Sequence, residues 1–366
     1  MNRKTLISLL TLAALLVLAA SLTNLSERLG GNFNQMLLPK LEAQLNSLTS
    51  IRVIGGGNQT IASLSRGENA WKLADKFGYR ADIGRIRSNL LALARAKIVE
   101  QKTAKPEYFE RLGVEDVAGE AAKGVLIELE SLDKPVKIII GDTDVGGGDY
   151  AYARKADENQ SWLISGAFDL PTDTLAWLDR EILDIPTARI RAVTITHSDG
   201  EVLRIEKAAA ENPNFEVQGI PDDRELNYPS VANAIAGVLT GLRLEDVRTD
   251  MGLDSAEATP SRIVFETFDG LRIDLTVYSL TDDNWTLVSA RVGELSNPAA
   301  AENSAGAEDQ PDIKKPAIDD EVEKLNARLG GWAYTLASYK SEQLLKRIDE
   351  LLAPVDDDRP LPEKIN

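Results

Sequence analysis

His197 is the first residue to consider for chemistry, because imidazole is the usual general base and metal ligand near neutral pH. It is the single histidine of the chain, it ends an alternating segment, 190–197, and it precedes a Ser198-Asp199-Gly200 turn. The chain has no cysteine, and one histidine without cysteine does not make a zinc site of any usual kind. We therefore expect His197 to be an exposed residue at the end of a strand.

Two glycine-rich segments resemble ion-binding or phosphate-binding loops. The segment 141–149 is similar to a calcium loop, but Gly146 stands where an Asp or Asn ligand is expected and no Glu closes the loop. Gly55-Gly56-Gly57 is not followed by Gly-Lys-Ser/Thr and does not open a helix, which argues against a phosphate loop. Both segments are predicted to be turns between strands.

Adjacent carboxylates occur at Asp222-Asp223 and at Asp282-Asp283. Both pairs are predicted to lie in turns, whereas acid–base chemistry of the glycosidase type needs two carboxylates that converge in a cleft. The sequence therefore predicts no catalytic residue, no cofactor-binding residue, no metal ligand and no bound cofactor, and we expect the protein not to be an enzyme.

Four of the five tryptophans fall in, or at the start of, predicted strands: Trp71, Trp162, Trp285 and Trp332. Trp162 and Trp332 hold equivalent places in two similar halves of the chain. This equivalence favours packing in the core over stacking on a ligand.

The elements that would position any site occur twice along the chain. Each copy has a strand pair, an aromatic-led strand, an amphipathic helix, a turn containing glycine and further strand pairs. The matching segments are Trp71-Lys72-Leu73 and Phe215-Glu216-Val217, the helices opened by Asp82 and Ser230, Leu112-Gly113-Val114 and Met251-Gly252-Leu253, and the strands led by Trp162 and Trp332. The alternating strands need one covered face, and amphipathic helices can cover it.

The predicted fold class is α+β, with two similar repeats that each consist of an antiparallel sheet with packed helices. Repeat one spans residues 51–186 and closes with a helix over 172–183, while repeat two spans 190–355 and includes a helix over 230–244. Asp269-Gly270, between two alternating runs, is a strong hairpin signal.

The second copy carries an insertion. Seven residues separate Arg154 from Trp162, whereas forty separate Arg291 from Trp332. The added segment 299–316 is rich in Ala, Glu, Asp and Pro, and its composition predicts a disordered loop. A short helix is expected over 318–329, and residues 356–366 form a C-terminal tail.

The N-terminus predicts a membrane anchor. Arg3 and Lys4, within the cytoplasmic end at 1–4, precede an uncharged apolar run over 5–22, which is just long enough to span the bilayer as a helix. A cleavable signal peptide, with Ala19 and Ser21 near the cleavage site, is the alternative. Both interpretations place the rest of the chain outside the cytoplasm. Residues 24–50 form a neck with a short amphipathic helix that we expect to pack on the first domain.

The charge balance bears on the partners. The chain has 58 Asp and Glu against 41 Lys and Arg, a net charge of -17. It also lacks a basic cluster with interleaved aromatic residues, so a nucleic-acid partner is not expected.

An ordered set of short segments resembles the domain-of-unknown-function family 4340 (DUF4340) of bacterial envelope proteins. The set consists of Leu38-Pro39, Ile51-Arg52-Val53, Trp71-Lys72-Leu73, Tyr79-Arg80-Ala81-Asp82, Lys102-Thr103, the run from Tyr108 to Val114, Ile140-Gly141, Tyr152-Ala153-Arg154 and Trp177-Leu178-Asp179-Arg180. Ala153 departs from the valine expected there. The resemblance implies association with an ABC-type transport system of the gliding-motility type, and it brings no catalytic residues.

These observations lead to one expected function and one alternative. The expected function is a non-catalytic accessory component of an ABC-type transport system, a single-pass protein of the inner membrane with its C-terminal domain in the periplasm. Its expected partners are permease and ATPase subunits or other envelope proteins. The alternative is an envelope module that binds a glycan or a peptide.

Overall fold

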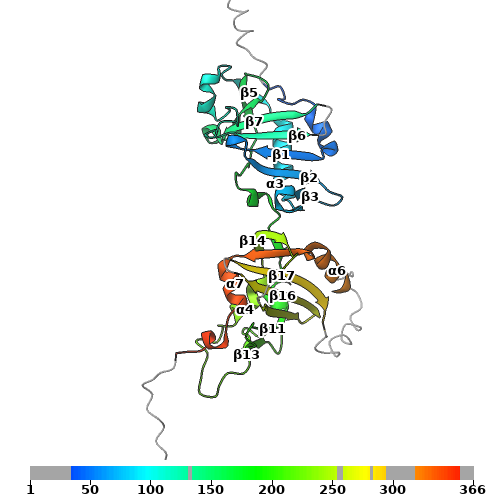
Figure 1. Cartoon of the computed structure of the whole chain (residues 1–366), viewed down its shortest axis with the longest axis vertical. Helices are drawn as coiled ribbons and strands as arrows, with labels where there is room; N and C mark the ends of the chain where they lie inside the picture. The colour runs from blue at the N-terminus through cyan, green and yellow to red at the C-terminus, as the bar shows by residue number, and fades with distance from the viewer. Residues whose placement is uncertain (1–33, 131–133, 254–258, 281–282, 294–317, 355–366) are drawn as a thin grey trace, which may run out of the picture. The chain divides into compact units, whose positions relative to one another are not determined.

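The computed structural model describes residues 34–130, 134–253, 259–280, 283–293 and 318–354, and the chain divides into two compact units between Asp179 and Arg180 (Figure 1). The predicted anchor at 5–22, the predicted disordered insertion at 299–316 and the tail at 356–366 lie outside the described residues. In the part that is described, no helix is long and apolar enough to cross a membrane.

Unit 1 contains a nine-stranded antiparallel sheet. Its strand order is β4-β3-β2-β1-β6-β7-β8-β9-β5. The strands are β1 (Ser50–Ile54), β2 (Thr60–Arg66), β3 (Trp71–Leu73), β4 (Tyr79–Arg80), β5 (Ile98–Gln101), β6 (Val125–Glu130), β7 (Val136–Thr143), β8 (Tyr150–Lys155) and β9 (Ser161–Ser165).

One face of this sheet is covered by helix α3 (Ile83–Arg95). The Asp82 carboxylate accepts a hydrogen bond from the Arg85 backbone N–H and caps the helix, as its sequence position predicts. Ile86 and Leu93 of α3 lie opposite the strand residue Val53 around a cavity of about 20 Å³. The helix therefore buries its apolar side on the sheet, and it lies behind β1 and β2 in Figure 1.

The other face of the sheet is covered in part by the 3-10 segment η4 (Pro106–Leu112). Phe109 and Val114 pack there on a cluster of buried residues that includes Leu126 and Ile139. Gly124, just before β6, and Gly141 of β7 allow the close approach. A Cβ at Gly124 would lie 2.2 Å from the Gly113 carbonyl oxygen, and one at Gly141 would lie 2.1 Å from the Leu112 carbonyl oxygen. The sheet of unit 1 thus has apolar packing on both faces.

The neck residues belong to unit 1. Helix α2 (Leu41–Gln44) continues into the 3-10 turn η1 (Leu45–Ser47), and Leu37, Leu41 and Leu48 are buried. The short helix predicted from the leucine spacing is therefore present.

Unit 2 contains a second nine-stranded antiparallel sheet, with the order β10-β14-β18-β17-β16-β15-β11-β12-β13. Its strands are β10 (Glu181–Leu183), β11 (Ile190–Thr196), β12 (Val202–Glu206), β13 (Glu216–Val217), β14 (Leu242–Thr249), β15 (Ser261–Thr267), β16 (Leu271–Ser279), β17 (Asn284–Val292) and β18 (Trp332–Leu336).

The two sheets share one strand order. The run β3-β2-β1-β6-β7-β8-β9-β5 of unit 1 corresponds to β13-β12-β11-β15-β16-β17-β18-β14 of unit 2, with the strands in the same sequence order. The correspondence continues beyond these strands. In unit 1 Met36 pairs with Lys97 beside β5, and in unit 2 β10 pairs in the same place with β14. The isolated bridge between Ala81 and Leu178 of unit 1 likewise corresponds to the bridge between Leu226 and Leu352 of unit 2.

Two of the helix predictions are wrong. Residues 172–183 form the 3-10 turn η6 (Thr174–Trp177) and then strand β10, which belongs to the sheet of unit 2. Residues 230–244 form only α4 (Asn233–Ala236) and the 3-10 turn η8 (Gly237–Leu239), and Leu242 already begins β14. Gly241, with a φ of 56°, adopts the left-handed conformation and turns the chain from η8 into β14.

Two further helices pack in unit 2. Helix α6 (Ile318–Leu329) lies where a helix was predicted after the insertion. Its Asn326 side chain donates to the Ala290 carbonyl and accepts from the Ala290 N–H, both at 2.8 Å, which fixes α6 beside β17. Helix α7 (Ser338–Leu344) follows β18, and its Leu344 is buried.

Candidate functional site

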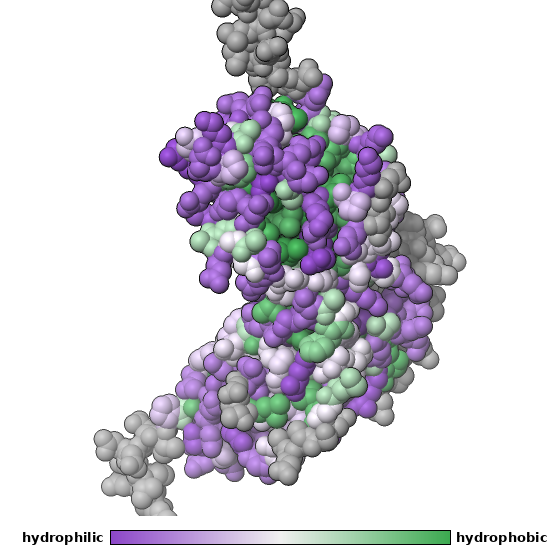
Figure 2. Space-filling view, turned by 45° about the horizontal axis from the view of Figure 1, so that its top comes forward, coloured by the Kyte–Doolittle hydropathy of each residue, from purple (hydrophilic) through white to green (hydrophobic). Residues whose placement is uncertain are grey.

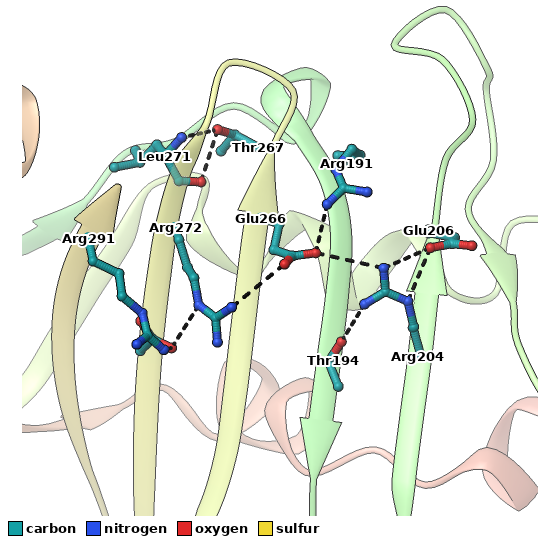
Figure 3. A network of polar contacts seen from close by, with 10 residues as sticks. Arg191, Thr194, Arg204, Glu206, Glu266, Thr267, Leu271, Arg272 and Arg291 are labelled. Atoms are coloured by element: carbon teal, nitrogen blue, oxygen red, sulfur yellow. Dashed lines mark hydrogen bonds and ion pairs between the residues drawn. The ribbon is translucent and has the colours of Figure 1, made fainter. Parts of the chain in front are cut away.

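A row of charged side chains crosses one face of the unit 2 sheet (Figure 3). Glu266 of β15 lies at its centre and forms ion pairs with Arg191 of β11 at 2.9 Å and with Arg204 of β12 at 3.7 Å. On its other side Glu266 lies 3.7 Å from Arg272 of β16. Arg272 and Arg291 both contact the Asp274 carboxylate. The row therefore links five adjacent strands through alternating charges.

Unit 1 carries a smaller arrangement at the matching position. Glu128 of β6 pairs with Arg52 of β1 at 3.0 Å and with Lys137 of β7 at 2.6 Å. The Glu128 side chain is 7% exposed. Because Glu128 lies opposite Lys137 as Glu266 lies opposite Arg272, both sheets place a carboxylate between cations of the two flanking strands. Because both carboxylates are already paired with cations of the neighbouring strands, their role is to hold adjacent strands together.

A groove of about 680 Å³ lies at one end of the unit 1 sheet. The start of β8 contributes Asp149 and Tyr150, the end of β9 contributes Ser165, and α3 contributes Ser88 and Arg95. The Ser165 hydroxyl accepts a hydrogen bond from the Lys97 backbone N–H at 3.1 Å. The groove is therefore lined by hydroxyl groups, a carboxylate and a guanidinium, together with the apolar residues Leu91, Ala92 and Ala167.

Unit 2 has a groove of about 520 Å³ at the corresponding strand ends. The start of β17 contributes Asp283, the end of β18 contributes Thr335, and α7 contributes Ser341 and Glu342. The Thr335 hydroxyl accepts a hydrogen bond from the Asp246 backbone N–H at 2.8 Å, which repeats the role of Ser165.

The two grooves share their strand positions and the types of side chain that line them. Each has an aspartate before the first strand, a hydroxyl at the end of the second, a helix serine and a cation, which is Arg95 in unit 1 and Lys346 in unit 2. The covering helix differs, because α3 precedes its strands in the chain and α7 follows them. We call these two hollows the strand-end grooves. Their side chains offer hydroxyl groups and a carboxylate to a polar ligand or a partner loop, whereas Arg95 is paired with Glu42 and Lys346 with Glu350.

His197 does not lie where it was predicted. It follows β11, but it is 5% exposed rather than exposed, and its Nε2 lies 3.2 Å from the Lys346 carbonyl oxygen. A segment far away in the sequence covers it, and that segment is fixed by Arg347, whose guanidinium binds the carboxylates of Asp199 and Glu201. The histidine thus packs beneath residues 346–350. We call the contact between this segment and the carboxylates of Asp199 and Glu201 the latch.

Electrostatic shifts follow from these contacts. The Glu201 backbone N–H, and then the Arg347 guanidinium, lower the pKa of Asp199. The Arg347 backbone N–H, and then the Lys346 ammonium group, lower the pKa of Glu350 although partial burial opposes the shift. Both carboxylates are therefore held in the ionised form that the latch requires.

A second cluster joins α6 to the sheet. Burial would raise the pKa of Asp269, but the Thr267 hydroxyl and the Arg189 guanidinium together lower it. The hydrogen bond to Glu321, the largest cause, raises the pKa of Arg189. This cluster closes the β15–β16 turn and anchors the start of α6.

Lys340 of α7 has a different environment. Its Nζ donates to the carbonyl oxygens of Gly237, Val238 and Thr240, and burial lowers its pKa. Since the ammonium group caps the end of η8, its role is to attach α7 to that turn.

The glycine-rich segments form turns, as predicted. Residues 145–147 form the 3-10 turn η5 between β7 and β8, and Gly55–57 lie between β1 and β2. Among the described residues, no group of three or more His, Asp or Glu side chains could hold a metal ion. Asp222 and Asp223 are exposed in a loop, and Asp282 lies outside the described residues.

The tryptophans divide into two groups. Trp71 and Trp177 are buried, whereas Trp162, Trp285 and Trp332 are half-buried. Trp162 pairs with Gln101 of β5 and Trp332 with Thr249 of β14, so the two hold matching places in their sheets. Neither lines a strand-end groove.

Sequence reasoning named Asp283 and the segment that ends at Asp149 only as parts of turns, and it missed the other residues of both strand-end grooves and of the charged row. Hydroxyl and charged side chains in alternating strands are ordinary outward-facing residues, so their types alone give no signal. Figure 2 shows such hydrophilic side chains over much of the visible surface, with hydrophobic side chains in smaller areas between them.

Comparison with known proteins gives one match. The sequence model of a family described as "Domain of unknown function (DUF4340)" matches residues 71–261, which is more than half of the chain. The match runs from β3 of unit 1 to the start of β15 in unit 2. No curated protein and no solved structure matches the chain.

Proposed function

The chain belongs to the DUF4340 family, and from that premise we propose that it is a non-catalytic, membrane-anchored, extracytoplasmic accessory component of an ABC-type transport system. In this proposal residues 5–22 span the inner membrane, and both units lie in the periplasm. The chain consists of two copies of one sheet-and-helix module, and it acts by binding permease or ATPase-associated subunits or other envelope proteins.

The repetition of the strand-end grooves is the observation that carries a binding function. Ser165 and Thr335 accept the same hydrogen bond from a neighbouring backbone N–H, and Asp149 and Asp283 each directly precede the adjacent strand, β8 or β17. A hollow that recurs at the same strand ends supports a shared recognition role, because packing of the two sheets alone does not require an open hollow at both positions. Two such grooves on one chain allow bivalent binding, which raises avidity.

Membrane anchoring is supported by the sequence. The run 5–22 is uncharged and follows Arg3 and Lys4, and the short segment 23–33 links it to the first described residue, Asn34. The neck residues Leu37 and Leu41 are buried in unit 1, so a short link ties the first unit to the proposed anchor.

A second candidate function is an envelope module that binds a glycan or a peptide. The lining of the unit 2 groove favours it, because Asp283 and Glu342 offer carboxylates and Ser338, Ser341 and Thr335 offer hydroxyls to a polar ligand. The two candidates differ in whether the grooves contain a soluble ligand or a loop of a transporter subunit.

Site-specific photo-crosslinking in intact cells separates these candidates. A photoreactive residue would replace Ser88 in the unit 1 groove or Glu342 in the unit 2 groove, and the exposed Val202 of β12 would serve as the control position. We expect crosslinks from both grooves to the extracytoplasmic loops of an ABC-type permease, identified by mass spectrometry, and few from Val202. Crosslinks to glycan or peptide alone would support the second candidate, and equal labelling from all three positions would contradict groove recognition.

A further inference from the structure

A separate groove of about 390 Å³ lies between the neck and the β6–β7 hairpin of unit 1. It is lined mainly by apolar groups, and Lys40 and Lys134 stand on either side of it. The remaining lining residues are Leu38, Pro39, Leu41, Gln44 and Val136. We call it the neck groove.

The two lysines are available for an external partner. Both are exposed, and neither forms an ion pair with any residue that the structure describes. By contrast, the nearby cations Arg95 and Lys137 are paired with Glu42 and Glu128. Two unpaired ammonium groups beside an apolar hollow stand out on a chain with a net charge of -17.

This combination fits an anionic amphiphile. Apolar side chains favour the boundary between headgroup and acyl chain, and each lysine near an anionic surface strengthens binding about fivefold. A soluble anion would use the lysines but not the apolar wall, and a neutral lipid would use the wall but not the lysines.

The position of the groove in the chain points to the source of the ligand. Eleven residues, 23–33, separate the apolar run 5–22 from Asn34, and an extended segment of that length reaches at most about 40 Å. The groove begins four residues later, at Leu38. It is therefore tethered within reach of the membrane surface.

We propose that the neck groove binds anionic phospholipid headgroups of the membrane that anchors the chain, and so holds unit 1 against the bilayer. This inference rests on the proposed anchor, but it makes a distinct claim about Lys40, Lys134 and the apolar wall between them. Docking would restrict where unit 1 stands relative to the membrane surface.

The test uses the full chain in nanodiscs. The protein has no cysteine, so Val136→Cys in the groove and Glu120→Cys, beside the turn at the opposite end of β1, each give a single labelling position. An environment-sensitive fluorophore at either position is exposed to lipids with a nitroxide on the headgroup. The discs contain either phosphatidylcholine alone or phosphatidylcholine mixed with phosphatidylglycerol.

We expect quenching at position 136 in the anionic discs, weak quenching in the zwitterionic discs and little at position 120. The double variant Lys40→Gln/Lys134→Gln should lower the ratio of docked to undocked protein about 25-fold. Lys105→Gln/Lys123→Gln removes two exposed lysines of the same unit and should leave the ratio unchanged.

Equal quenching at positions 136 and 120, or quenching that persists in Lys40→Gln/Lys134→Gln, would overturn the proposal. Failure of the chain to insert into the discs at all would instead contradict the anchor, and with it the proposed function. Since insertion is measured by disc co-purification and docking by quenching, the two failures are distinguishable.

Discussion

Glu128 on β6 and Glu266 on β15 hold the same position in the two sheets, and each carboxylate lies between cations of both flanking strands. The surroundings differ in burial, because the side chain of Glu128 is 7% exposed and that of Glu266 is 26% exposed. Removal of one partner from a buried ion pair is more destabilising than removal from an exposed pair, because it leaves a buried charge unpaired. The same contact should therefore contribute more to stability in unit 1.

Glu128→Gln tests this difference. We expect it to destabilise unit 1 by about 1–2 kcal/mol, a value moderated by the exposure of Arg52 and Lys137, and to lower its melting temperature by several degrees. Glu266→Gln should cost about half as much, because the Glu266 carboxylate is itself more exposed, and water screens its charge more strongly than that of Glu128. The measurement is thermal unfolding followed by circular dichroism, with the exposed Glu107→Gln as control. An effect of Glu266→Gln larger than that of Glu128→Gln would contradict the burial argument.

Gly124→Ala tests the close packing of η4 on the unit 1 sheet. The new Cβ would lie 2.2 Å from the Gly113 carbonyl oxygen and 2.8 Å from a methyl carbon of Ile139, so the backbone must shift. We expect a loss of about 3 kcal/mol in the free energy of unfolding, measured by urea titration.

Gly119→Ala is the matched control. It lies in the same loop region, and a Cβ added there would have the Asp116 carbonyl oxygen as its nearest contact, at 3.7 Å. Equal stability of the two variants would show that η4 does not pack on the sheet as described.

The latch over His197 predicts a pH dependence. The pKa values of Asp199 and Glu350 are lowered from ordinary values of 3.8 and 4.5, so their stabilising contribution is complete above those values and is lost as pH falls through the lower folded values. As the pH falls below these ordinary values, the segment 346–350 should therefore open before the sheets unfold.

Hydrogen exchange of residues 346–352, corrected for the intrinsic rate at each pH, measures this opening. We expect stronger protection at neutral than at acidic pH, and weak protection at both in Arg347→Gln, which removes the guanidinium that binds Asp199 and Glu201. Protection that is independent of pH in the wild-type chain would refute the electrostatic latch.

The proposed topology predicts the location of the C-terminus. Arg3 and Lys4 should stay in the cytoplasm while residues 5–22 span the membrane. A reporter that is active only in the periplasm, fused after Asn366, should be active, and a cytoplasmic reporter at the same place should be silent. Activity of the cytoplasmic reporter would exclude the anchor and the cleaved signal peptide together.

Local patterns were sufficient to predict much of the strand structure. The alternation on both sides of Asp269-Gly270 predicts the β15–β16 hairpin, and the Asp82 cap predicts the start of α3. These features depend on neighbours in sequence, which a pattern can represent.

The errors arise where tertiary contacts override a local pattern. Leu175, Leu178 and Ile182 have helical spacing, but the pairing of β10 with β14 places Ile182 in a sheet. Likewise, Lys346, whose carbonyl group covers His197, lies 149 positions further along the chain, so the sequence near the histidine does not indicate its burial. The unit 1 groove combines the ends of β8 and β9 with helix α3, which lies more than fifty residues earlier in the chain, so no local pattern indicates it.

Quantitative co-purification of the intact protein from solubilised membranes tests the central claim most directly. The account predicts enrichment of ABC-type permease and ATPase subunits with the wild-type chain, reduced by a double variant that alters both strand-end grooves, Ser88→Arg/Glu342→Arg, and retained with Glu107→Gln. Membrane-bound protein that enriches no ABC-type subunit over a control anchored by an unrelated domain would contradict it.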